Sequence, residues 1–145
     1  MSTSPVILPL AAAGLCSALA GLAHLACIVI GAPAYRVMGA GERMVRAAEA
    51  GRPAAALLTT GIAAVLLGWA LLAWQASGLL LAGHALPGTS LLLALVTAIY
   101  LMRAFATPWL RPHFPGNSPR FWQVSGSLCA LIGGLHAWGW VAAFT

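Results

Sequence analysis

The sequence predicts an all-α integral membrane protein, a four-helix bundle of antiparallel spans with a short interfacial helix between spans one and two. Of its 145 residues, 61% are hydrophobic and 6% are charged, whereas about 25% are charged in a soluble domain. Four apolar runs reach the length of about 20 residues that a spanning helix needs. The charged side chains lie almost entirely between those runs. We therefore expect a single transmembrane domain over residues 1–145.

The four spans are expected at about residues 7–30, 53–75, 89–107 and 121–144. The third run is only just long enough to cross a bilayer. Spans two and four each follow a polar residue and a proline, Arg52-Pro53 and Ser118-Pro119. Proline at the first helical position marks a helix start, and serine is a favourable N-cap.

The interfacial helix is predicted within "GERMVRAAEAG", where helix-forming residues stand between two glycines. Arg43, Arg46 and Glu49 would face water on one side of it. Glu42 and Arg46 are four residues apart in the favourable acid-to-base order. These features are typical of a short amphipathic helix at a membrane surface.

The arginines predict the orientation. Connection one (residues 31–52) holds four arginines and both glutamates, connection three (108–120) holds two arginines, and connection two (76–88) holds no charge and one histidine, His84. Loops with arginine stay in the cytoplasm. We therefore expect a multi-pass protein of a bacterial inner (cytoplasmic) membrane, with both termini periplasmic or extracellular. The net charge of +5 is then explained by arginines that anchor the ends of the spans, and a nucleic-acid partner is not expected.

Small side chains recur along three of the spans, where close backbone approach supplies the packing energy. The stripes are Gly14, Ala18 and Gly21 in span one; Ala56, Thr60, Ala64 and Gly68 in span two; and Ser125, Cys129, Gly133 and Ala137 beside Gly126, Ala130 and Gly134 in span four. They predict an intimate bundle. Excess small surface on span four would also allow a homodimer.

Arg103 stands inside the third apolar run, where a guanidinium is costly unless something holds it. The predicted orientation places His24, Tyr100 and the polar start of span four at a similar depth near the cytoplasm. Glu42 is the expected counter-charge, and His24 would bond to Tyr100 or to a backbone carbonyl. Three interpretations of Arg103 stay open: snorkelling to the headgroups, an inter-helix clamp and a functional site.

An anion site is predicted at the cytoplasmic surface, where spans two and four would begin. Helix N-termini favour anions through their free N–H groups and dipole. The candidate ligand-binding residues are Arg52, Arg103, Arg111, Asn117, Ser118 and Arg120.

The sequence offers no metal-ligand spacing, and no metal is expected. The cysteines form no CxxC pair, and the chain has no Asp for a catalytic triad. His136 would lie about 13 Å in depth from His24, given a rise of about 1.5 Å per residue. No role for His136 and no cofactor follow from the sequence.

The stretches "GAPAYRVMGAGERMVRAAEAG" and "FPGNSPRFWQVSGSLCALIGGLHAWG" resemble small bacterial four-span membrane proteins, and the layout is similar to that of the DoxX-like group. The resemblance implies four helices in one compact unit and assigns no functional residue.

The predicted function is binding of an anionic or lipophilic ligand (a lipid or a quinone) or of a partner helix at the cytoplasmic leaflet. The first alternative is a membrane enzyme acting on a lipophilic substrate. His24 would be its acid or base, Arg103 and Tyr100 would stabilise negative charge, and Glu42 would orient them. The second alternative is a subunit of an oligomeric transporter.

Overall fold

The computed structural model describes residues 7–78 and 86–145, and every regular element in these ranges is helical. The predicted all-α class is therefore confirmed. His84 lies outside the described residues. The four longest helices are α1 (Leu8–Ile30), α4 (Pro53–Ala76), α5 (Thr89–Phe105) and α7 (Pro119–Phe144). The short elements are α2 (Ala32–Val37), α3 (Glu42–Glu49), α6 (Thr107–Leu110) and the 3₁₀ turn η1 (Arg111–His113).

Three described helices, α1, α4 and α7, are long and apolar enough to cross a membrane. A fourth crossing exists if α5 and the segment Thr107–His113 count as one span, bent by 59° at their junction. Pro108 explains the bend, because it has no N–H to give to the carbonyl of Ala104. The hydroxyl of Thr107 donates to that carbonyl instead, at 3.2 Å. The third predicted span is therefore shorter and less straight than expected.

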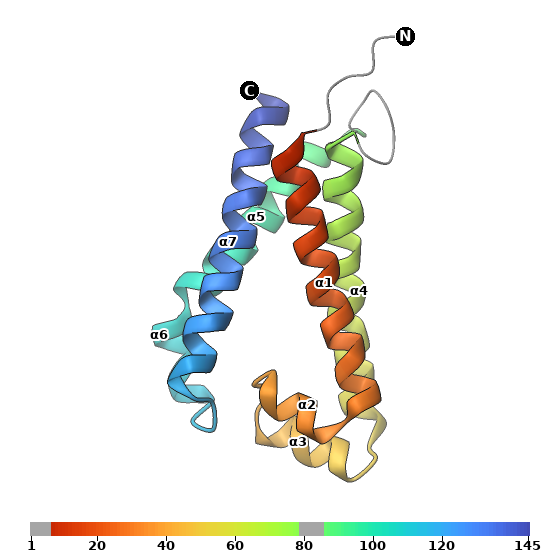
Figure 1. Ribbon diagram of the computed structural model, residues 1–145, viewed down its shortest axis with the longest axis vertical. Coiled ribbons are helices and arrows are strands. Elements are labelled where there is room, and N and C mark those ends of the chain that lie inside the picture. Colours follow the sequence, from red (N-terminus) through yellow and green to blue (C-terminus); the bar gives the residue numbers. More distant parts are fainter. Residues whose placement is uncertain (1–6, 79–85) are drawn as a thin grey trace.

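The long helices pack as two pairs (Figure 1): α1 with α4, called the first pair, and α5 with α7, called the second pair. The pairs join where α1 begins and α7 ends, called the junction end. Two apolar clusters hold them there, one around Leu10 and Leu93 and the next around Leu66 and Tyr100. Both clusters draw residues from all four helices.

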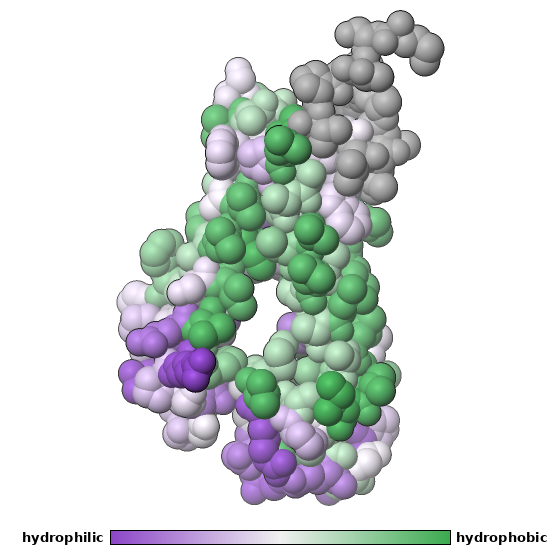
Figure 2. Space-filling model, in the orientation of Figure 1, coloured by the Kyte–Doolittle hydropathy of each residue, from purple (hydrophilic) through white to green (hydrophobic). Residues whose placement is uncertain are grey.

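The opposite end, called the charged end, carries α2, α3 and the segment from α6 to the start of α7. Its buried cluster of Cys27, Tyr35, Val45 and Ala55 belongs to α1, α2, α3 and α4 alone. The second pair contributes nothing to this cluster, so the pairs separate toward the charged end. Figure 2 shows the resulting opening between them, bordered mostly by hydrophobic side chains, with hydrophilic side chains gathered on both sides of the charged end.

The small residues of α1 lie at the helix contact as predicted, since Gly14, Ala18 and Gly21 are all buried. The stripe predicted for span two is wrong. Thr60, Ala64 and Gly68 are exposed, and α4 instead buries Ala55, Thr59, Ala63 and Ala70 among others. Small residues occupy adjacent faces of this helix, and their spacing alone cannot tell which face packs. The homodimer stays a prediction.

The helix predicted in connection one is confirmed as α3, and its Val45 is 2% exposed. The predicted Glu42–Arg46 pair is absent from the ion pairs of the described residues, where Glu49 pairs with Arg36. The reason is α2, which the sequence did not indicate. It folds back beside α3 and brings Arg36 to the end of that helix.

The predicted cap at Ser118 is also confirmed, because its hydroxyl accepts the N–H of Phe121 at 3.1 Å. Ser118→Ala should lower the free energy of unfolding by about 1 kcal/mol, the usual cost of losing an N-cap. Thermal unfolding in detergent, followed by circular dichroism, measures the change. Ser127→Ala, at an exposed position of the same helix, is the control and should leave the midpoint unchanged. Equal midpoints for both variants would contradict the capping role.

Candidate functional site

Arg103 in the last turn of α5 is held against α7 by two contacts. Its Nη2 donates to the hydroxyl of Ser125 at 3.0 Å. Its guanidinium carbon lies 5.4 Å from the ring centroid of Trp122, within the range of a cation–π contact. Trp122 and Ser125 are three residues apart and so share one face of α7. This arrangement matches the expected contact with the polar start of span four.

The guanidinium extends toward the charged end of the molecule. A Cβ placed on Gly133 would lie 3.1 Å from the Cβ of Tyr100, so these two positions are level. At a rise of about 1.5 Å per residue, Arg103 lies about 4.5 Å closer to the charged end than Tyr100. Ser125 lies about 12 Å closer to the charged end than Gly133. The side chain spans the difference, as in a snorkelling arginine. The end of this side chain contacts α7, however, so Arg103 has features of both the snorkelling and the clamp interpretations.

Two hydrogen-bond donors at this contact have no partner among the described residues. They are Nη1 of Arg103 and Nε1 of Trp122, and both atoms are buried. A buried donor without an acceptor costs about 1–3 kcal/mol, and more when the group is charged. An acceptor that served both atoms would remove this cost.

Glu42, the expected counter-charge, does not pair with Arg103. The ion pairs of the described residues are limited to Arg36 with Glu49. Glu42 is exposed at the start of α3, where it lines a cavity of about 720 Å³ with Met44, Leu58 and Phe114. The position of Glu42 depends on how α2 and α3 fold back, which no sequence pattern indicated.

His24 and Tyr100 also do not join Arg103 by any hydrogen bond. Of the two partners considered for His24, the backbone carbonyl is the one found, since its Nδ1 lies 2.8 Å from the oxygen of Ala20. The hydroxyl of Tyr100 bonds to that of Ser17 at 2.9 Å. The structure therefore does not assemble the four candidate catalytic side chains into one hydrogen-bonded set.

Tyr100 instead belongs to a buried polar cluster that sequence reasoning missed. Its ring stacks on His136, with centroids 5.5 Å apart, and meets Trp69 edge-on at 5.2 Å. With Ser17 this cluster takes one residue from each long helix. His136 is 0% exposed, and its Nδ1 lies 2.9 Å from the carbonyl of Ile132. Its Nε2 has no partner among the described residues.

Among the described residues, none of the other predicted ligand-binding residues makes a hydrogen bond to Arg103. Arg52, Arg111 and Arg120 are exposed at the start of α4, in η1 and at the start of α7. Asn117 is occupied, because its Nδ2 donates to the carbonyl of Gly39 at 3.0 Å. Arg111 and Asn117 line a cavity of about 460 Å³. The exposed arginines add positive charge to the charged end.

In the part of the chain that the structure describes, no group of three or more His, Cys, Asp or Glu side chains could hold a metal ion. No protein-family model, curated protein or solved structure matches the chain. The resemblance to the DoxX-like group therefore stays a prediction, and function must be inferred from the geometry of the chain itself.

Proposed function

We propose that this chain is a four-span, antiparallel protein of a bacterial inner membrane that binds an amphiphile with an anionic headgroup at Arg103. The charged end would face the cytoplasm, since the connections that carry arginine lie there. An oxygen of the headgroup would accept from Arg103 Nη1 and Trp122 Nε1. The tail would lie in the opening between the two pairs.

The observation that carries the proposal is that, among the described residues, the guanidinium of Arg103 has one buried nitrogen without a hydrogen-bond partner and no carboxylate partner. Ser125 is a neutral acceptor for Nη2, and Trp122 offers only its ring face. Neither neutralises the charge. In a membrane an uncompensated guanidinium is costly, so an anionic ligand gains more there than it would in water. A phosphate or carboxylate also matches the fork of donors that arginine presents.

The same reasoning favours an anion over the other predicted ligands. A quinone carbonyl could accept a hydrogen bond but would leave the positive charge of Arg103 unbalanced. The backbone of a partner helix has free acceptors only at its C-terminal end, where the last carbonyls are unpaired. An anionic headgroup supplies both the acceptor and the charge.

Native mass spectrometry of the detergent-purified chain tests the proposal with three ligands: phosphatidylglycerol, phosphatidylcholine and water-soluble glycerol phosphate. The wild type should retain phosphatidylglycerol in preference to the other two. Arg103→Gln should weaken that retention about tenfold or more, because it removes at least one charge-assisted hydrogen bond.

Arg46→Gln is the matched control, since Arg46 is exposed on α3 and takes no part in the proposed site. It should retain phosphatidylglycerol as the wild type does. Equal losses of phosphatidylglycerol retention in the two variants would mean that the lipid is held by general positive charge and not by Arg103. Equal binding of glycerol phosphate would indicate a soluble anion, and equal binding of phosphatidylcholine would remove the requirement for an anionic headgroup.

A further inference from the structure

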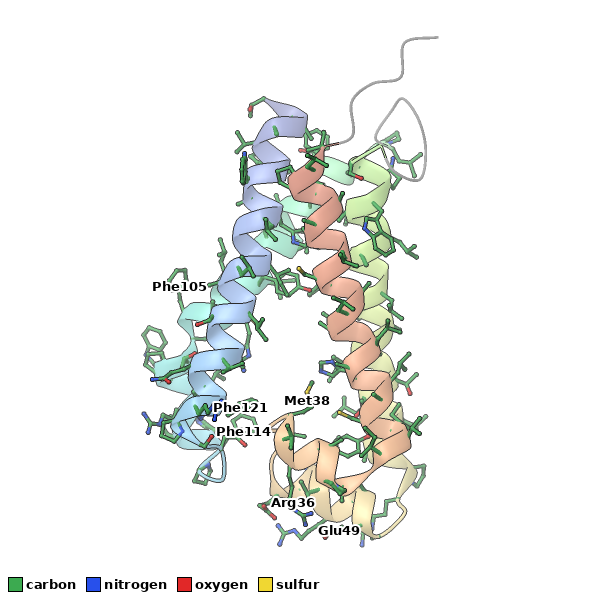
Figure 3. The ribbon with its side chains drawn as sticks, in the orientation of Figure 1. Arg36, Met38, Glu49, Phe105, Phe114 and Phe121 are labelled. Atoms are coloured by element: carbon green, nitrogen blue, oxygen red, sulfur yellow. The ribbon has the colours of Figure 1, made fainter. Side chains whose placement is uncertain are left out.

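At the charged end the two pairs touch again, through a small set of contacts between the loop after α2 and residues in the first turn of α7 and in the segment before it. Asn117 donates to the carbonyl of Gly39 at 3.0 Å. The ring of Phe121 lies where a Cβ on Gly39 would stand, and the ring of Phe114 lies 3.3 Å from the corresponding point of Gly41. Figure 3 shows Phe114 and Phe121 near Met38, between the start of α7 and the α2 segment.

These contacts, called the latch, are weak beside those at the junction end. The latch has one part-buried hydrogen bond and two ring-to-glycine contacts, whereas the junction end has two apolar clusters built from all four helices. The α2–α3 segment is anchored to the first pair by the buried cluster of Tyr35 and Val45. Separation at the latch would therefore move the second pair relative to the first, with the junction end as the pivot.

The latch is also connected to the proposed headgroup site. Phe121 meets Trp122 edge-on with centroids 5.3 Å apart, and Phe114 lies 6.2 Å from the same ring. The guanidinium of Arg103 lies over the ring of Trp122. The rings that close the opening thus pack directly against the residue that offers the second unused donor.

We infer that the latch is a releasable closure, which opens the space between the two pairs at the charged end so that a headgroup can reach Arg103. This inference rests on the proposed function for its ligand but not for its motion. The substitutions that weaken the latch are made outside Arg103 and Trp122, so they should change the rates of entry and exit together and leave the affinity nearly constant.

Gly39 provides the test. It has φ +65°, and a Cβ there would meet the ring of Phe121. Gly51 has φ +64° but nothing within 4 Å of its Cβ position. Gly39→Ala and Gly51→Ala therefore carry the same backbone strain, and only the first displaces the latch. Asn117→Ala removes the hydrogen bond without any strain.

The motion is measured by electron–electron distance spectroscopy on the full chain with its native cysteines replaced by alanine. Two spin labels at positions 37 and 123 measure the distance across the latch. Two control labels at positions 102 and 128 measure the distance between α5 and α7. All four positions are exposed. Gly39→Ala and Asn117→Ala should lengthen or broaden the first distance only. An unchanged first distance in both variants would overturn the inference.

The ligand rates are measured in the native-cysteine chain, with pyrene-labelled phosphatidylglycerol displaced by an excess of unlabelled lipid. Gly39→Ala should raise the dissociation rate and the association rate of the lipid by about tenfold each, because the latch loses one hydrogen bond and one ring contact. Gly51→Ala should have the rates of the wild type. Unchanged rates with intact binding would overturn the gating role. If the lipid binds to no variant, the proposed function fails, while the label distances still decide the motion.

Discussion

Gly133→Leu is expected to destabilise the chain by forcing apart the contact between α5 and α7. A Cβ at this position would lie 2.8 Å from Cδ2 of Leu101 and 3.1 Å from Cβ of Tyr100. The first neighbour can turn aside, but the second is fixed to the backbone of α5. Larger side chains in a packed core typically cost about 1–3 kcal/mol. Leucine would force the two helices apart and disturb the buried Tyr100–His136 stack.

Gly134→Leu is the matched control, because nothing lies within 4 Å of its Cβ position. Both substitutions gain the same helix propensity over glycine, about 0.8 kcal/mol, so the difference between them isolates the helix contact. Thermal unfolding of each variant in the same detergent gives the comparison. A midpoint for Gly133→Leu equal to that of Gly134→Leu would show that α5 and α7 do not approach closely at this level.

Trp122→Ala is the second large effect. Trp122 is 4% exposed and lies between Phe114, Phe121 and Arg103. Its truncation should lower the free energy of unfolding by about 3 kcal/mol, at the lower end of the range for buried aromatic residues. Retention of phosphatidylglycerol should fall about tenfold as well, because the guanidinium loses its platform and the ligand loses one donor.

Trp122→Phe separates the two contributions. It keeps an aromatic face for Arg103 and for the neighbouring rings but removes Nε1, which has no partner among the described residues. We expect the unfolding midpoint to change little and lipid retention to fall by a few-fold, about 1 kcal/mol for one hydrogen bond. Full lipid retention by Trp122→Phe would exclude Nε1 from the site. A loss of stability as large as that of Trp122→Ala would indicate that Nε1 has a structural partner.

Much of the helical framework could be predicted from the sequence, because apolar run length, proline starts and glycine boundaries act locally. The cap at Ser118, the helix α3 and the buried glycine face of α1 were found in this way. The bend after Phe105 was not, although Pro108 was visible. Whether a proline ends, bends or starts a helix depends on which donor bonds to the freed carbonyl, and here the hydroxyl of Thr107 donates to it.

The candidate site was predicted only in part, because depth along a span says little about where long side chains end. Arg103 was expected beside the polar start of span four, and it bonds to Ser125 there. The partnership of Tyr100 with His136 was missed, because the sequence does not indicate which faces of the third and fourth spans meet. For His24 two partners were open, Tyr100 or a backbone carbonyl, and it bonds to the carbonyl of Ala20 in its own helix.

The most direct test of the headgroup site is the distance between arginine nitrogens and lipid phosphorus, measured by solid-state NMR dephasing in phosphatidylglycerol bilayers with ¹⁵N-labelled arginine. Exposed arginines contribute to the signal in every sample, so the comparison is between the wild type and Arg103→Gln, with Arg46→Gln as the control. We expect the wild type to contain one strongly dephased, immobile guanidinium that Arg103→Gln removes and Arg46→Gln retains. Identical dephasing in the wild type and Arg103→Gln would mean that no phosphate reaches Arg103, which would contradict the proposed function.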